Sequence, residues 1–167
     1  AQHTAAFDGL ARGAAASVSA DAARWGPREL ANGCWGVAKL LRDSPEAARD
    51  FFDAVAPAAL LKAGEFNAFD VANTLWAHAR CDARAPQLFA ALATEAVAKI
   101  GTFNAQALSN TVWAVSTAHV HTPLLFEAAA KESIRKMSSF DPQALSNVAW
   151  AYANAGVEAP ALFEAIS

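Results

Sequence analysis

Charge, cysteine and long apolar runs are scarce in this chain, and each shortage excludes a class of protein. Charged residues make up 17% of the sequence against 54% hydrophobic ones, a balance that excludes intrinsic disorder. The two cysteines, Cys34 and Cys81, form no CxxC pair, so we expect no disulfide framework and a reducing compartment. No run of about 18 uncharged apolar residues exists, so we also expect no membrane insertion.

Motifs for catalysis and for metal binding are absent as well. The sequence has no GxxxxGK[ST] phosphate loop, no GxSxG elbow and no HExxH helix, and its carboxylates are not paired in an apolar setting. His119 and His121 form an HxH pair near an expected turn, but no third ligand lies close in sequence, so we interpret both as surface residues. We therefore expect a protein that is not an enzyme and that has no metal, no cofactor and no small-molecule substrate.

The charge that is present is slightly acidic, with a net charge of −3 and an isoelectric point near 5.8. A protein that binds nucleic acid mainly through phosphates is normally basic, so this balance argues against strong, sequence-independent nucleic-acid binding. Residues 1–24 carry Asp8 and Asp21 and have no apolar h-region, so no targeting peptide is visible. We expect any such segment to lie upstream or to have been removed.

An internal repeat is the dominant feature of the sequence. Each copy has an aromatic residue, an asparagine seven residues later, a tryptophan three residues beyond it and a proline ten residues after the tryptophan. The tryptophans, spaced by 41, 37 and 37 residues, are Trp35, Trp76, Trp113 and Trp150. The asparagines are Asn32, Asn73, Asn110 and Asn147. Four copies of one spacing exclude chance and indicate a unit that stacks on itself.

Each copy predicts two helices, helix A after the aromatic residue and helix B from the proline onward. In the fourth copy Asp141 suits an N-cap and Pro142 the first helical position, and no helix breaker follows until Gly156. The same cap position in the other copies holds Asn104, Asn67 and Gly26. The third copy predicts a complete helix B over residues 123–137.

The pattern predicts an all-α fold, a right-handed α-solenoid of tandem antiparallel helix pairs with a repeat of about 37 residues. We assign the whole chain, 1–167, to one array and expect it to be a segment of a longer one, because no polar capping repeat is visible. The expected units are the end of a preceding repeat at 1–24, repeat 1 with a four-residue insertion at 25–65, repeat 2 at 66–102, repeat 3 at 103–139 and an incomplete repeat 4 at 140–167. Pro57 interrupts repeat 1, so we expect its helix B to break or kink near Ala56.

Helical periodicity assigns faces to helix A when positions are counted from its aromatic residue. Offsets 5, 6, 9 and 13 fall on one arc and predict a buried stripe. The stripe holds Leu30, Ala31, Cys34 and Ala38 in repeat 1, and Leu108, Ser109, Val112 and Ser116 in repeat 3. The tryptophans flank this stripe, and for them we favour packing between repeats over stacking on bases.

The asparagine at offset 7 needs a reason, because a mid-helix Asn costs a few tenths of a kcal/mol relative to Ala. One explanation, which we favour, is a ladder in which each amide hydrogen-bonds across the seam between repeats. The other is contact with a ligand. Both explanations predict that the four asparagines lie in line along the stacked helices.

Offsets 3, 7 and 14 share one angular strip, so stacked repeats align them as a track of Gln, Asn, Arg and Lys side chains. Such side chains suit the reading of base edges, although ordinary solvated positions have the same composition. The predicted track, for RNA or another partner, consists of Arg28, Asn32, Lys39, Phe69, Asn73, Arg80, Gln106, Asn110, Thr117, Gln143, Asn147 and Asn154. Helix A of repeat 3 has no charged side chain, and a basic cluster lies instead on helix B, the expected outer layer. That cluster is Lys131, Arg135 and Lys136.

At "FDPQALSNVAWAYANAG", "FNAQALSNTVWAVSTA" and "FNAFDVANTLWAHARC" the sequence resembles the octotricopeptide repeat family. Members of that family are arrays of roughly 38-residue helix pairs, akin to the repeat regions upstream of RAP domains. The resemblance covers about residues 25–167. It implies RNA binding in a chloroplast or mitochondrion, where such proteins stabilise, process or translate transcripts or hold rRNA in an organellar ribosome.

Two functions from different classes remain open. The first, which we favour, is an RNA-binding module whose A helices line a groove for single-stranded RNA or rRNA; the family signature and the polar track support it. The second is a scaffold or architectural subunit that binds protein subunits of a large organellar assembly. The acidic charge and the uncharged A helices support the second.

Overall fold

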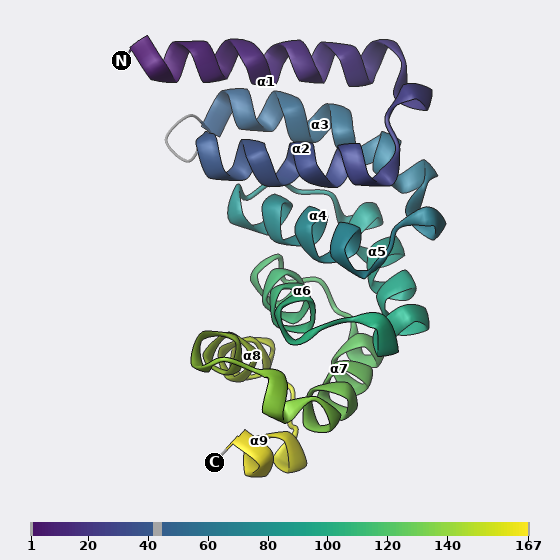
Figure 1. Ribbon diagram of the computed structural model, residues 1–167, viewed down its shortest axis with the longest axis vertical. Helices are drawn as coiled ribbons and strands as arrows, with labels where there is room; N and C mark the ends of the chain where they lie inside the picture. The colour runs from purple at the N-terminus through teal and green to yellow at the C-terminus, as the bar shows by residue number, and fades with distance from the viewer. Residues whose placement is uncertain (1, 42–44, 167) are drawn as a thin grey trace.

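The chain folds as a row of helices in two layers (Figure 1). The computed structural model describes residues 2–41 and 45–166, and within them it has nine α-helices and no strand. The helices are α1 (Gln2–Ala20), α2 (Pro27–Leu40), α3 (Pro45–Leu61), α4 (Ala68–Arg80), α5 (Pro86–Lys99), α6 (Ala105–Thr117), α7 (Pro123–Arg135), α8 (Pro142–Ala155) and α9 (Pro160–Ile166). Residues 1, 42–44 and 167, which belong to the expected units at 1–24, 25–65 and 140–167, lie outside the described residues. The predicted all-α solenoid of helix pairs is confirmed.

Helices α2, α4, α6 and α8 form layer A, and helices α1, α3, α5, α7 and α9 form layer B. Each helix packs against the next one in its own layer, and α2, α4 and α6 also contact the B helix that follows them in the chain. The helix axes turn progressively along the array: α1 and α2 lie across the view, whereas α6 and α8 are seen almost end-on (Figure 1). The two described ends of the chain therefore lie at opposite ends of a twisted stack.

The A helices begin and end where the capping residues predict. The side-chain oxygen of Asn67 accepts hydrogen bonds from two backbone amides of the first turn of α4. The backbone amide of Asn67 in turn donates to the Asp70 carboxylate at 3.2 Å. Asn104 and Asp141 each accept one such bond, at 2.8 and 2.7 Å. At the other end of α8, Gly156 takes the left-handed conformation with φ of 65°, which glycine tolerates without strain. Each cap contributes about 1 kcal/mol of helix stability.

The buried stripe is confirmed in α2 and α6, where every predicted position is buried, but not in α8, where Leu145 and Ala149 are half-buried and Ser146 and Ala153 are exposed. Ser116 uses this position to join two repeats, because its hydroxyl donates to the Ala151 carbonyl of the next A helix at 2.9 Å. In layer B, Phe89 and Phe126 are buried one turn after their helix prolines. Tyr152 links the layers by donating to the Phe126 carbonyl at 2.6 Å. Small side chains in the stripe let the A helices approach closely.

The helix break that we expected near Ala56 does not occur. Helix α3 runs unbroken through Pro57 and has 17 residues, against 14 in α5 and 13 in α7. The four inserted residues amount to about one turn of 3.6 residues, so they lengthen the helix without rotating its buried face. Pro57 itself is exposed, and the carbonyl that loses its partner there can bond to water. Burial of Val55 and Ala59 on the opposite side then holds the helix together.

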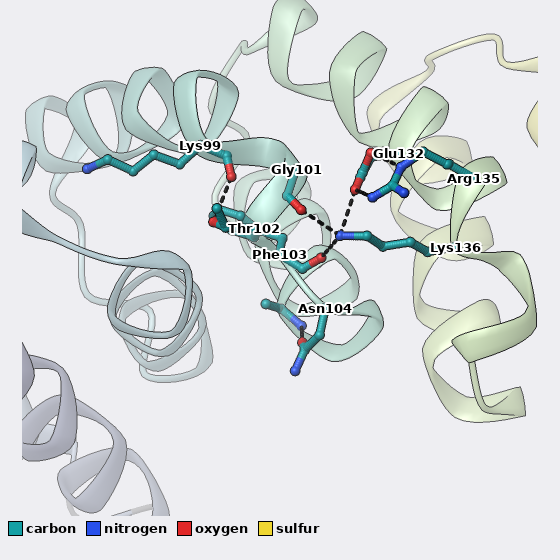
Figure 2. Close-up of polar contacts among 9 residues, drawn as sticks. Lys99, Gly101, Thr102, Phe103, Asn104, Glu132, Arg135 and Lys136 are labelled. Carbon is teal, nitrogen blue, oxygen red and sulfur yellow. Dashed lines mark hydrogen bonds and ion pairs between the residues drawn. The ribbon is translucent and has the colours of Figure 1, made fainter.

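A lysine at the end of a layer B helix ties each turn between repeats to the turn before it. Lys62, Lys99 and Lys136 stand 37 residues apart, each four residues before the aromatic residue that precedes the next A helix. The Lys136 ammonium donates to the carbonyls of Gly101 and Phe103 at 2.9 and 2.5 Å (Figure 2). We call these three residues the lysine clamps.

The other two lysine clamps make the same contact one repeat earlier. Lys99 donates to the carbonyls of Gly64 and Phe66, both at 2.8 Å, and Lys62 donates to three carbonyls, the nearest being that of Trp25 at 2.6 Å. These carbonyls end short 3₁₀ turns, where the backbone lacks helical partners. The clamps therefore satisfy backbone acceptors that would otherwise be unpaired.

Carboxylates hold two of the clamps in place. Glu132 lies 2.6 Å from the Lys136 ammonium and also accepts hydrogen bonds from Arg135, and these contacts lower the Glu132 pKa to about 2 (Figure 2). Glu95 lies 2.8 Å from Lys99 in the same arrangement. Of the basic cluster on helix B, Lys136 is thus engaged in packing, whereas Lys131 and Arg135 form ion pairs while their own side chains stay 74% and 62% exposed.

Lys136→Met should lower the free energy of unfolding by about 1.5 to 3 kcal/mol, because hydrogen bonds to a charged donor are lost and two carbonyls are left unpaired. Urea titration followed by circular dichroism measures the change. Lys131→Met is the matched control, since Lys131 is 74% exposed and pairs only with Glu127, and it should cost less than about 0.5 kcal/mol. Equal effects of the two substitutions would show that the clamp is an ordinary surface contact.

One histidine is enclosed in the core between the layers. His78 is 1% exposed and packs edge-on against Phe52 and Phe89, at centroid distances of 4.6 and 6.3 Å. Its Nδ1 donates to the Thr74 carbonyl at 2.8 Å, so the ring is neutral with its proton on Nδ1. Burial lowers the His78 pKa from its usual 6.5 to about 4.

The low pKa of His78 predicts loss of stability in mild acid. Between pH 6.5 and pH 4 the unfolded chain binds a proton at this residue that the folded chain does not, so stability present above pH 6.5 falls as the pH drops. The loss should reach about 2 to 3 kcal/mol by pH 4.5. Urea titrations from pH 7.5 to 4.5 should show a smaller decline for His78→Asn than for the exposed control His119→Asn. Parallel curves would contradict the assignment.

Candidate nucleic-acid interface

The predicted track lies on the face of layer A that points away from layer B. Its exposed members are Arg28, Asn32, Lys39, Phe69, Arg80, Gln106, Gln143 and Asn154. Its partly exposed members are Asn110, Thr117 and Asn147. Asn73 lies deepest and is 9% exposed. Because offsets 3, 7, 10 and 14 recur on one side of a helix, each A helix presents one strip of these side chains.

Two adjoining grooves gather the amide side chains of the track. One, of about 350 Å³, crosses α2, α4 and α6, and the other, of about 360 Å³, lies between α6 and α8. Gln106 and Asn110 line both, so the two grooves adjoin on either side of α6. We call this surface the amide groove, defined by Asn32, Asn73, Gln106, Asn110, Gln143 and Asn147. Phe69 also lines it.

The other track residues are not brought into the amide groove. Arg28 lies outside its lining, and the offset-14 residues lie two turns further along the helices. Asn154 at that offset is a packing residue, since its Nδ2 donates to the Ser116 carbonyl at 3.2 Å and to the Ser116 hydroxyl at 2.9 Å. Lys39, Arg80 and Thr117 share its offset. The structure therefore divides the predicted track into a groove and a separate row near the helix C-termini.

The asparagine ladder that we favoured does not form. Within the described part of the chain, the side chains of the four repeated asparagines take part in one hydrogen bond. In it Gln143 Nε2 donates to Asn147 Oδ1 at 3.0 Å, so the bond stays inside α8. The amides of Asn32, Asn73 and Asn110 bond to no described residue. Across the seam between α6 and α8 the hydrogen-bonded side chains are Ser116 and Asn154, and Asn110 and Asn147 form no bond to each other there. Each free amide keeps two donors and an acceptor facing the groove.

The amide groove is almost uncharged. Among the residues that line its two parts, Asp141 is the charged one, and its carboxylate already caps α8. Asn104 lines the groove as well and likewise caps a helix. A groove of this composition binds through hydrogen bonds and stacking, and charge attraction contributes little.

The tryptophans lie on the same face, one turn beyond the asparagines. Trp113 and Trp150 contact each other across a seam at a centroid distance of 6.4 Å, and the Lys39 ammonium lies 5.4 Å from the Trp35 ring and 6.0 Å from that of Trp76. Contacts between repeats agree with the packing role predicted for these residues. Yet Trp35 and Trp150 keep 46% and 45% of their surface exposed.

Sequence reasoning missed the lysine clamps and the separation of the track into two parts. The clamps had a signal, since Lys62, Lys99 and Lys136 recur with the period of the repeat. The division of the track had none, because it depends on the angle at which helices cross.

Across residues 2–41 and 45–166, no helix is long and apolar enough to span a bilayer, and no three His, Cys, Asp or Glu side chains gather as a metal ion would require. His119 and His121 are both exposed. Cys34 and Cys81 are free thiols, and burial raises the Cys34 thiol pKa well above its usual value, which makes it unreactive.

A groove of free amides on an α-solenoid places the chain in the class of helical-repeat binding proteins. Residues 14–167 match the family model of RNA-editing substrate-binding complex 6 protein, and the chain belongs to that family. No curated protein matches the chain. The family is related to RNA, as the resemblance implied, but it is not the octotricopeptide repeat family. The residues that carried the resemblance specify helix packing, a problem that different repeat families solve with similar side chains.

Asn110→Ala should leave stability unchanged or raise it by a few tenths of a kcal/mol, because a free mid-helix amide gives way to the best helix former. Asn154→Ala, its matched control, should cost about 1 kcal/mol through its lost hydrogen bonds to Ser116. Thermal and urea unfolding of the two variants measure both changes. If Asn110→Ala proves as costly as Asn154→Ala, the amide groove is structural.

Proposed function

We propose that the protein is a non-catalytic RNA-binding component of an RNA-editing assembly, and that it binds single-stranded RNA along the amide groove. The observation that carries this proposal is the row of amides on neighbouring helices that bond to none of the described residues, Asn32, Asn73 and Asn110. Asn in the middle of a helix is less favourable than Ala, and here its side chain gains no hydrogen bond within the described residues that would offset the cost. A ligand in the groove that supplies these hydrogen bonds accounts for the residue.

The chemistry of the amide groove suits bases better than phosphates. Asn and Gln both donate and accept, which matches the mixed donors and acceptors on the edges of unpaired bases. Such edges are accessible in single strands and hidden in the narrow major groove of duplex RNA. Because the amides recur once per repeat along a stack, they suit a polymer whose bases also recur.

Charge supports the same preference. The chain has a net charge of −3, and the lysine clamps hold three of its cations in the turns. Ten of the 13 Lys and Arg residues are not clamps, but of these only Arg28, Lys39 and Arg80 stand on the A helices. Affinity should then depend only weakly on salt, with a log–log slope of about 1 to 2 units.

Family membership extends the proposal to partners and location. The family takes its name from an RNA-editing substrate-binding complex, so we propose that other subunits of such a complex are protein partners. We place the protein in the mitochondrion. Neither the chloroplast nor the organellar ribosome implied by the octotricopeptide resemblance gains support from this family.

A scaffold role is the second candidate, and the exposed surface of layer B favours it. Leu10 in α1, Leu61 in α3 and Leu124 in α7 are all largely exposed, at 69%, 83% and 69%. Single exposed leucines are ordinary on a protein surface, so the scaffold role requires that these three gather into one patch that a partner covers. Layer B can thus serve protein subunits while layer A serves RNA.

Fluorescence anisotropy with a labelled, randomised single-stranded RNA pool tests the proposed function. The triple variant Gln106→Ala, Asn110→Ala, Gln143→Ala should weaken binding about 150-fold, at about 1 kcal/mol for each of three lost hydrogen bonds. Gln87→Ala, an exposed amide on α5 in layer B, is the control and should bind like the wild type. Repeating the titration across salt concentrations should give the shallow slope stated above. Absence of wild-type binding, or a triple variant with wild-type affinity, would exclude RNA recognition by the amide groove.

A further inference from the structure

The tryptophans of layer A expose more ring than packing requires. Trp35 and Trp150 are almost half exposed, although tryptophan gains more from burial than most side chains. Both stand at the same offset as Trp76 and Trp113, so the four rings follow one line across the stacked helices. Trp35 also lines the amide groove directly. We call the four residues the tryptophan row.

We infer that the tryptophan row is a stacking platform on which the bases of single-stranded RNA lie, while the asparagine one turn away bonds to the base edge. This inference rests on the proposed function. Each repeat carries the pair, since Asn110 precedes Trp113 by three residues and the other repeats keep that spacing. Residues three apart in a helix are neighbours on its surface. A base has a π-face and a polar edge. In such a pair the tryptophan ring stacks on the face and the asparagine hydrogen-bonds to the edge.

The charge of the surrounding strip favours a nucleic acid over a peptide. Offsets 7, 10 and 14 of the A helices hold Asn, Trp, and then Lys39, Arg80, Thr117 and Asn154, with no carboxylate. Basic peptides are the polymers that tryptophan faces attract through cation–π contact, and they would find no acidic group there. A phosphate backbone meets no repulsion in the same strip.

The two halves of the tryptophan row are not equivalent. The Lys39 ammonium lies near the rings of both Trp35 and Trp76 and already forms a cation–π contact with them. Between Trp113 and Trp150 no cation intervenes, and the rings are tilted by 34°. The exposed face of Trp150 is therefore the more open platform, and we assign it the larger share of stacking.

Binding of fluorescein-labelled single-stranded RNA, followed by anisotropy and by quenching of intrinsic tryptophan fluorescence, tests this inference. Trp150→Leu should weaken binding about 5- to 100-fold, and Trp150→Phe should restore most of the affinity because an aromatic face remains. Trp25→Phe changes a tryptophan outside the row and should bind like the wild type. An abasic strand of the same length keeps the phosphates but has nothing to stack, so it should bind poorly. Circular dichroism confirms that each variant is folded.

Failure of the inference and failure of the proposed function give different results. If wild-type protein binds the RNA but Trp150→Leu and Trp35→Leu bind equally well, the tryptophan row is a packing feature and the amide groove alone carries recognition. If the wild type binds no RNA, the proposed function fails and the inference falls with it. Quenching by an arginine-rich peptide, without quenching by RNA, would make the platform a protein-binding surface.

Discussion

The seam between successive A helices is the contact on which the rest of the structure depends. Its recurring position holds Ala31, Ala72 and Ser109, all buried, and side chains this small bring helix axes to about 8–10 Å. Because each seam repeats the last, side chains at any outward offset line up with their counterparts. The amide groove and the tryptophan row both follow from that alignment. Neither surface therefore requires an additional helix, and each uses residue positions that every repeat already provides.

Cohesion and recognition use different residues of one repeat. The lysine clamps bind carbonyls in the turns, where their charge satisfies backbone acceptors, and they leave the A face nearly neutral. A basic A face would attract every nucleic acid, whereas a neutral one with free amides and rings responds to unpaired bases. An acidic net charge is then compatible with a role beside an RNA-editing substrate.

Features set within one turn of helix could be predicted from the sequence, and features set between helices could not. Asp141 and Gly156 fixed the limits of α8 because caps act locally. The helix break that Pro57 suggested does not occur, because the burial of Val55 and Ala59 outweighs the effect of one proline. The asparagine ladder was wrong because the packing of neighbouring helices decides which side chains meet, and the pattern of a single helix does not encode that packing. The sequence pattern predicted the track of polar side chains. Its division into the amide groove and a separate row near the helix C-termini became evident in the folded structure.

The B helices shorten along the array, whereas the A helices do not. Helices α1 and α3 have 19 and 17 residues, about 28 and 26 Å, and lie side by side, whereas α7 has 13 residues, about 20 Å. The A helices keep 13 or 14 residues from α2 to α8. The taper is therefore confined to layer B, and each A helix offers the same length of outward face to the surface that carries the amide groove and the tryptophan row.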